Sequence, residues 1–260
     1  MNIGSIPGNI DRYPAIMEPI SVYPELEVDP VFANNSWRII KQVSTEYIAK
    51  QGMIAQEIFE KYGWQLGDLK PYVISGQTIN AQIMDFNHDI KTVGGNAGIS
   101  FFSKDILNAT MSMNTTATNS GGYDVSYLRD KLNTEVFNSL ETDLQKVIVS
   151  VKKLTANGGN QSNISIIPSS DKLWIISLTE LNGANDGAFS HIGEGFQYAY
   201  WVGRPYSDYK RNNQANNSYW TRSPYPSSPY VFTNISNIGQ IKINIYANDS
   251  TVGVVLGFCI

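Results

Sequence analysis

The chain has 260 residues, of which 42% are hydrophobic and 16% are charged, and its formal net charge is −4. A chain of this length can bury a sizeable core, either as one large domain or as two small ones. The slight acidity argues against a general nucleic-acid binder, and the single cysteine, Cys259, excludes an internal disulfide framework.

Residues 1–33 differ from the rest of the chain because five prolines recur there among apolar residues. Since proline disfavours helices and central strands, we predict an extended N-terminal arm, followed by a globular domain at residues 34–260. The arm is too apolar for a solvated linker, so we expect it to lie along its own domain or along a neighbouring subunit. Its expected anchoring side chains are Ile10, Tyr13, Ile16 and Tyr23.

Residues 1–14 lack the basic segment and apolar run of a secretory signal. No apolar stretch of the sequence approaches the length that spans a bilayer. We therefore expect synthesis in a cytosol without membrane insertion. Any external location would then be reached by another route, such as assembly into a particle.

The first half of the domain carries readable helix and hairpin signals. Asn35 and Ser36 are suited to cap a helix, and apolar residues recur at helical spacing up to Gly63, with a predicted break at Gly52. Residues 72–84 then read as a hairpin that turns around residues 75–77.

The second half is predicted to hold one more helix and several short strands. We expect a strand at residues 98–102, a helix capped by Asp124, a buried strand at residues 172–177, and a largely irregular segment at residues 181–217. The apolar C-terminus predicts a last strand that buries Phe258 and Ile260. Helices followed by many short strands, without β-α-β alternation, indicate an α+β fold.

The acidic segment Asp85–Asp89 is a candidate ion site, because oxygen ligands at alternating positions suit Ca²⁺. The glycine and distant glutamate of a helix-flanked calcium loop are not in register, and Asx-rich turns cap their own backbone without an ion. His88 and His191 do not lie at zinc-ligand spacing. The residues therefore favour a protein with no metal, no cofactor and no catalytic group, with a bound ion at this segment as the alternative.

Aromatic side chains gather between residues 196 and 230, where arginines and a lysine are interleaved with them. Aromatic rings stack on sugar rings, and the same mixture also forms protein interfaces. Three interpretations stay open, namely a buried core, a protein interface and a glycan site. The candidate binding residues are Tyr200, Trp201, Arg204, Tyr206, Tyr209 and Arg211.

A series of landmarks across residues 34–260 supplies a resemblance. The landmarks include Trp64–Asp68, Phe86–Asp89, Lys172–Ser177, Tyr219–Pro224 and Gly257–Ile260. In this order they resemble a family of uncharacterised domains found in phages and prophages of Gram-positive gut bacteria and in bacterial surface proteins. The resemblance implies a C-type-lectin-like fold, with two helices, a twisted sheet and a long loop region. Enzymes of the formylglycine-generating kind share this broad fold but use paired cysteines, and this chain has Cys259 alone.

The arm, the residues and the resemblance together favour a non-enzymatic structural protein displayed on the surface of a phage virion. Capsid decoration is slightly favoured, in several copies or as a homo-oligomer, with capsid or tail subunits as partners and synthesis in the cytoplasm of the host bacterium. The alternative is a tail or baseplate protein that binds a receptor or a cell-surface glycan through the aromatic loops at residues 196–230. A third hypothesis is an enzyme acting on cell-wall glycans.

Overall fold

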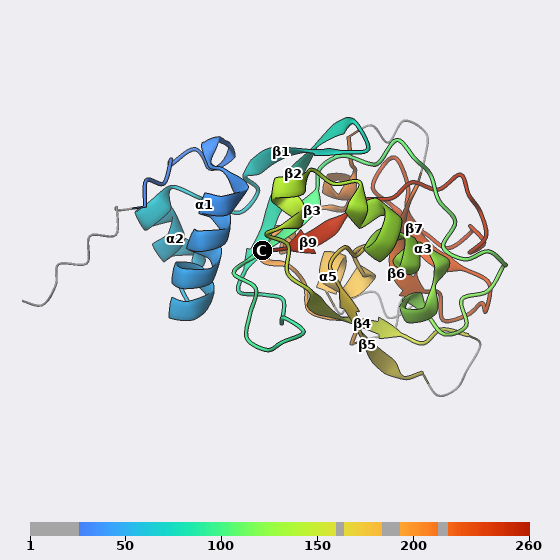
Figure 1. Ribbon diagram of the computed structural model, residues 1–260. Coiled ribbons are helices and arrows are strands. Elements are labelled where there is room, and N and C mark those ends of the chain that lie inside the picture. The colour runs from blue at the N-terminus through green and yellow to red at the C-terminus, as the bar shows by residue number, and fades with distance from the viewer. Residues whose placement is uncertain (1–25, 160–163, 184–192, 213–217) are drawn as a thin grey trace, which may run out of the picture.

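A computed structural model describes residues 26–159, 164–183, 193–212 and 218–260. It confirms the α+β class, with short helices and antiparallel sheets (Figure 1). The helices are α1 (Trp37–Gln42), α2 (Ala55–Tyr62), α3 (Tyr127–Lys131), α4 (Thr142–Gln145) and α5 (Leu178–Asn182). The strands are β1 (Leu69–Ile74), β2 (Gln77–Phe86), β3 (Ile99–Ser103), β4 (Val151–Ala156), β5 (Ile166–Asp171), β6 (Tyr219–Pro224), β7 (Phe232–Ile235), β8 (Ile241–Lys242) and β9 (Gly257–Cys259).

A four-stranded antiparallel sheet with the order β1-β2-β3-β9 forms the centre of the molecule. Figure 1 shows α1 and α2 at one end of the molecule, and it shows β9 near the middle of the molecule. The C-terminal strand is therefore part of the central sheet, and Phe258 and Ile260 are buried, as predicted. Two smaller sheets, β4-β5 and β6-β7-β8, complete the fold.

The central sheet separates two hydrophobic cores. Because neighbouring side chains on a strand point to opposite faces, Phe101 and Phe102 contribute to different cores. We call the side of Phe101, where the core includes Trp37 of α1, the helical face. The side of Phe102, where loop residues pack around Trp174, is the loop face.

The first helical region follows its sequence signals. The Ser36 hydroxyl accepts a hydrogen bond from Ile39 N–H, and α1 continues as a π-helical segment, Val43–Ala49. The break falls at Gly52, which has a φ of +67°. Gly98 brings this helix close to the sheet, since a Cβ there would lie 2.2 Å from the Ser44 carbonyl oxygen.

Two expected elements differ from the structure. The cap of α3 is Ser126, whose hydroxyl accepts a hydrogen bond from Arg129 N–H, so the prediction that Asp124 caps this helix was wrong. Asp124 lies in the preceding 3-10 turn, Tyr123–Val125. The segment at residues 172–177 is buried as expected, but it makes a single β-bridge, between Trp174 and Gly257, and no regular strand.

The end of the predicted arm packs against the helical-face core. Leu26 and Val28 contact this core, and Phe32 is buried edge-on against Trp64, with ring centroids 5.0 Å apart. The Trp64 indole donates a hydrogen bond to the Asp29 carbonyl oxygen. The predicted anchoring residues, Ile10, Tyr13, Ile16 and Tyr23, lie outside the described residues. Within the described residues, no helix has the length and apolarity that a membrane span needs.

Candidate functional site

The structure divides the six candidate binding residues into two groups. Trp201, Tyr209 and Arg211 are buried, each with at most 1% of its surface exposed. They fill the loop-face core and offer no surface for a ligand, so the expectation of one surface formed by all six residues needs correction. The three that reach the surface are Tyr200, Arg204 and Tyr206.

The buried group attaches the loop to the sheet. The Arg211 guanidinium lies over the rings of Phe102 and Trp201, at 4.8 and 4.7 Å from their centroids. It also donates to the side-chain oxygen of Gln82 on β2. Tyr209 meets Trp201 edge-on at 5.2 Å. A cation between two aromatic rings in a desolvated site contributes on the order of 2 kcal/mol, so this contact holds the loop firmly on the loop face.

The second group lies at or near the surface and contains one stacked pair. The Arg204 guanidinium stacks on the Tyr200 ring at 4.0 Å, and its Nε donates to the Tyr200 carbonyl oxygen. Tyr206 follows in a 3-10 turn, Tyr206–Tyr209, and is 47% exposed. The neighbouring Val202 is 64% exposed, and Ile238 on the adjacent turn is 58% exposed. We call these five residues the loop surface.

Close backbone contacts fix the loop surface in place. A Cβ on Gly67, which has a φ of +93°, would lie 2.9 Å from the Tyr200 ring. A Cβ on Gly239 would lie 2.0 Å from the Tyr206 carbonyl oxygen, so the turn that carries Ile238 touches this loop directly. Gln82 donates a hydrogen bond to the Tyr200 hydroxyl. The Tyr200 ring and the Tyr206 backbone are therefore each held by a close contact with a neighbouring turn.

A buried network of charges lies in the loop-face interior, around Lys153 on β4. Its ammonium contacts the Asp89 carboxylate at 2.7 Å, the Glu180 carboxylate at 2.5 Å and the Tyr198 hydroxyl at 2.9 Å. It also lies 3.9 Å from the centre of the Trp174 ring. Burial alone would lower the pKa of Lys153, but the charges of Asp89 and Glu180 raise it, so the ammonium form persists.

Arg222 on β6 continues this network. Its guanidinium contacts the Glu180 carboxylate at 2.5 Å and donates to the carbonyl oxygens of Ile175, Leu154 and Glu194. Burial opposes ionisation of Glu180, yet Arg222 and Lys153 together hold its pKa below the usual value. Two cations thus balance the two ionised carboxylates of Asp89 and Glu180, a condition for burying charge at tolerable cost.

Glu194 is the fifth member of the network and differs from the other carboxylates. Its two oxygens accept hydrogen bonds from Ala156 N–H and the Ser223 hydroxyl. It has no salt bridge within the described residues. Burial raises its pKa to about 7, against the opposing effect of these two hydrogen bonds. The Ser177 hydroxyl donates to the Glu194 carbonyl oxygen, which ties this residue to the first turn of α5.

Nucleophilic chemistry is disfavoured at Cys259, which borders the network. Its sulfur lies 3.4 Å from Asp89 and 3.6 Å from the Ser100 hydroxyl. Burial and the Asp89 charge raise the pKa of the thiol well above its usual value, so the reactive thiolate is not formed at neutral pH. Its expected role as a small buried residue is confirmed, and the contact with Asp89 adds to it.

The carboxylates of the segment Asp85–Asp89 serve protein contacts. Asp85 accepts hydrogen bonds from the backbone N–H groups of Phe86 and Ala199, and Asp89 pairs with Lys153. His88 stacks on the Tyr198 ring with centroids 4.1 Å apart. Across the described ranges, no group of three or more His, Cys, Asp or Glu side chains is arranged to hold a metal ion.

Sequence reasoning missed the buried network, because its members come from five separate segments. One local signal was available. Ser177 and Glu180 have the spacing of a capping box, and both of its hydrogen bonds form at the start of α5. No comparable signal marks Lys153 or Glu194.

Comparison with known families gives one match. Residues 97–256 match the family described as a domain of unknown function (DUF6273). The matched segment holds the loop surface and all network members except Asp89. No curated protein and no solved structure matches the chain.

Proposed function

We propose that this chain, which belongs to the DUF6273 family, is a non-enzymatic structural protein of a bacteriophage virion. In this proposal it is attached through its N-terminal arm and displays the loop surface outward. Other virion proteins, either capsid or tail subunits, are its partners, and it is present in several copies. Capsid decoration is slightly favoured over a position on the tail. The landmark residues and the composition of the arm support the phage assignment.

The buried charge network is the observation that carries the non-enzymatic part of the proposal. Its ionised groups are saturated by one another, and Lys153, Glu180 and Arg222 are each at most 2% exposed. Catalytic groups have to reach a substrate, whereas these groups join β4, α5 and β6 beneath the loops. Such a network supports a structural role, in which the loops are fixed on a rigid base.

We also propose that the fold is C-type-lectin-like. A central sheet that includes the C-terminal strand supports this assignment, as do the helices packed on one face and the long irregular segments on the other. The proteins of this fold display loops on a rigid sheet, and the close backbone contacts of the loop surface agree with that arrangement. Fold similarity by itself does not supply a function.

The beginning of the described chain supports anchoring by the arm. Leu26 and Val28 line a pocket of about 380 Å³ together with Tyr47, Lys61 and Tyr62. The described chain therefore begins on the helical face of the sheet, opposite the loop surface. Each apolar anchor such as Ile10 or Tyr13 would contribute about 1–3 kcal/mol if fully buried against a partner.

The alternative function is host attachment by a tail or baseplate protein. The Arg204–Tyr200 stack beside exposed Tyr206 favours it, because aromatic and arginine side chains dominate binding surfaces. Here the partner would be a glycan on the host cell surface, and many copies on one particle would add avidity to a weak contact.

Deletion of residues 1–25 tests the anchoring proposal. We expect the shortened chain to fold, since the described domain begins after this segment, and to be absent from purified particles when it is the sole copy expressed. Circular dichroism and thermal unfolding of the shortened chain verify its folding. If the folded, shortened chain still occupies particles at the level of the full chain, the arm is not the anchor.

A further inference from the structure

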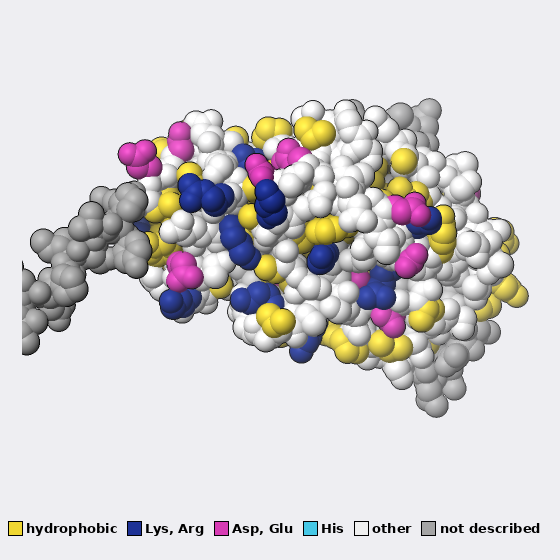
Figure 2. Space-filling view, in the orientation of Figure 1, with side chains coloured by type: hydrophobic (Ala, Val, Ile, Leu, Met, Phe, Trp, Pro, Cys, Tyr) yellow, Lys and Arg dark blue, Asp and Glu magenta, His cyan; other side chains and the backbone are white. Residues whose placement is uncertain are grey.

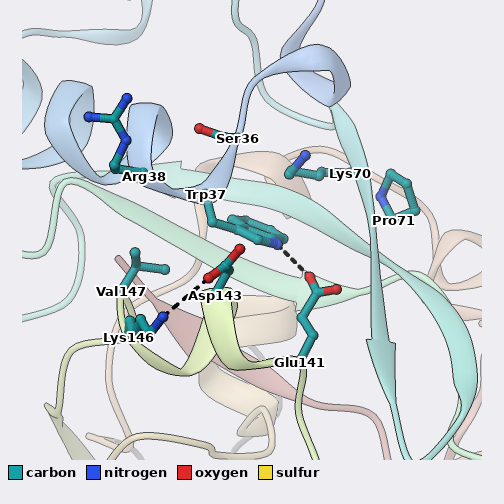
Figure 3. Close-up of a pocket in the computed structure, with 9 residues that line it drawn as sticks. All are labelled: Ser36, Trp37, Arg38, Lys70, Pro71, Glu141, Asp143, Lys146 and Val147. Atoms are coloured by element: carbon teal, nitrogen blue, oxygen red, sulfur yellow. Dashed lines mark hydrogen bonds and ion pairs between the residues drawn. The ribbon is translucent and has the colours of Figure 1, made fainter.

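The contact between Lys153 and Asp89 is closed off from water, unlike the ion pairs at the surface. Figure 2 shows lysine and arginine side chains over the face in view, and Figure 3 shows one surface pair, Lys146 with Asp143, in the lining of a pocket. Those two side chains are 68% and 83% exposed, so water screens their charges. The Lys153 side chain is 1% exposed and the Asp89 side chain 4%. This contact therefore holds an amine and a carboxyl group side by side without competing water.

The two side chains are placed for a bond between them. Lys153 Nζ lies 2.7 Å from Oδ1 of Asp89, and the carboxyl carbon is the next atom beyond this oxygen. Groups held together in a suitable orientation react as if at effective concentrations on the order of 10⁵–10⁸ M. The two backbones are also joined, because Lys152 N–H donates a hydrogen bond to the Ile90 carbonyl oxygen. Asp89 and Lys153 are thus fixed from both sides of the contact.

The second carboxylate oxygen of Asp89 is surrounded by hydrogen-bond donors. Oδ2 accepts hydrogen bonds from the Ser100 hydroxyl at 2.6 Å and from the Tyr198 hydroxyl at 2.8 Å, and the Cys259 sulfur lies 3.4 Å away. When an amine attacks a carboxyl carbon, negative charge develops on the oxygen that stays, and fixed donors around that oxygen stabilise the transition state. Oδ1 has no donor other than Lys153 among the described residues, so it is the oxygen free to leave.

Glu180 is placed to act as the base. Its Oε1 contacts Lys153 Nζ at 2.5 Å, and its Oε2 contacts the Arg222 guanidinium at 2.5 Å. Because arginine keeps its charge, Glu180 stays ionised when Lys153 gives up a proton. Asp89 has no lysine or arginine partner other than Lys153 in the described part of the chain, so it is the carboxyl group that receives this proton.

We propose that Lys153 and Asp89 become linked by an isopeptide bond, an amide between their side chains. A proton first crosses from Nζ to Oδ1. The Nζ lone pair then attacks Cγ of Asp89, and an electron pair of the C=O bond moves to Oδ2. Glu180 takes a second proton from Nζ and passes it to the Oδ1 hydroxyl, which leaves as water with the electron pair of the C–O bond. The Oδ2 carbonyl re-forms, Nζ keeps one hydrogen, and Glu180 is ionised again.

The charge state of the pair sets the pace of this reaction. Burial lowers the pKa of Lys153, but the charges of Asp89 and Glu180 raise it, so the ion pair is the main form before the bond is made. The proton shift gives a neutral amine and a neutral acid in low abundance and leaves the net charge of the network unchanged. Linking is therefore slow compared with folding. The amide then replaces two buried charges, whose desolvation is costly, and chains that are not yet linked keep the ion pair.

The bond would strengthen the base beneath the loops. It joins residues 64 positions apart and ties the segment after β2 to β4. A cross-link restricts the unfolded chain, as a disulfide does, in a protein whose single cysteine excludes an internal disulfide. This inference goes beyond the function proposed above, because the bond forms within one chain and does not depend on attachment to a particle.

The intact mass of the purified full chain tests the bond directly. After incubation of the folded protein at neutral pH, we expect a mass below the calculated value by one water molecule. Digestion should then yield a cross-linked pair of peptides that contain Lys153 and Asp89. A mass equal to the calculated value after prolonged incubation, with folding verified by circular dichroism, would overturn the proposal. A water deficit with Lys153 in a linear peptide, or with Lys153 linked to Glu180, would overturn it as well.

Two variants test the assigned roles. Asp89→Asn replaces the leaving oxygen by nitrogen, so the linked variant should lack one ammonia molecule instead of one water molecule. Glu180→Gln removes the base and should slow linking by about 10²–10⁴-fold. Glu135→Gln is the matched control, because Glu135 is exposed and pairs with Lys131, and it should link like the wild type.

Either variant can contradict the assignment. Glu180 is not the base if folded Glu180→Gln links as fast as Glu135→Gln. Loss of water from Asp89→Asn would show that the leaving group comes from another residue, and the proposed bond would then be wrong. The mass of the unaltered chain decides the proposal even where a variant does not fold.

Discussion

The protonation of Glu194 should make the stability of this protein depend on pH in an unusual direction. Burial raises the pKa of this carboxyl from 4.5 to about 7 in the folded protein. The folded state therefore holds the proton more tightly than the unfolded state, and the resulting stabilisation is complete below about pH 4.5 and lost as the pH rises through 7. At about 1.36 kcal/mol per pKa unit, the free energy of unfolding should fall by about 2.5 kcal/mol between pH 5 and pH 8.

Glu194→Gln isolates this contribution. The amide keeps an acceptor for Ala156 N–H and can donate to the Ser223 hydroxyl, which is the hydrogen-bond pattern of the protonated carboxyl. We therefore expect the variant to lose most of the change between about pH 5 and pH 8. His88, whose pKa the Asp89 carboxylate raises although burial lowers it, acts in the same direction but is present in both proteins. The difference between the two proteins thus reports on Glu194.

Urea unfolding followed by tryptophan fluorescence across this pH range supplies the measurement, because Trp174 and Trp220 are fully buried. Glu135→Gln is a suitable control, since its carboxylate is 70% exposed and pairs with Lys131 at the surface. The control should follow the wild-type pH profile. The raised pKa of Glu194 would be refuted if the Glu194→Gln protein kept the full wild-type dependence of stability on pH. It would also be refuted if the stability of the wild type did not change between about pH 5 and pH 8.

Two further predictions concern the network and the loop surface. Arg222→Met leaves Glu180 with one cationic partner in a buried site. The free energy of unfolding, measured by urea denaturation, should therefore fall by about 3–5 kcal/mol. A loss below about 1 kcal/mol would mean that the pair of Arg222 and Glu180 is not buried as described. Under the host-attachment alternative, Tyr206→Ala should weaken binding to host cells, and under either function it should leave the melting temperature unchanged, because Tyr206 is 47% exposed. Trp201→Ala should instead destabilise the domain by about 3–5 kcal/mol, and the reverse pattern would contradict the division into exposed and buried residues.

Local signals predicted the parts of the fold that depend on neighbouring residues. Ser36 caps α1, Gly52 interrupts the helical region, and the first hairpin turns where its sequence indicates. The cap of α3 was misassigned because Asp124 and Ser126 are both suitable capping residues two positions apart. The choice between them depends on where Leu128 packs in the core, which is a tertiary contact.

The candidate site was less predictable because irregular segments have no periodicity. On a helix or strand the spacing of apolar residues reveals the buried face. Trp201 and Tyr206 lie in short turns, where residue type alone does not show whether a side chain points to the core or to the surface. Burial of Arg211 between two rings depends on Phe102, far away in the sequence. The pairing of Lys153 with Asp89 likewise joins residues 64 positions apart.

Attachment to a virion is tested most directly by gold-labelled antibody against this chain, applied to intact particles and viewed by electron microscopy. We expect gold on the particle surface. Label spread over the head would identify capsid decoration, and label at the tail tip would identify the host-attachment alternative. Particles without gold, while the protein is present free in the same lysate, would contradict the proposal that this chain is a virion protein.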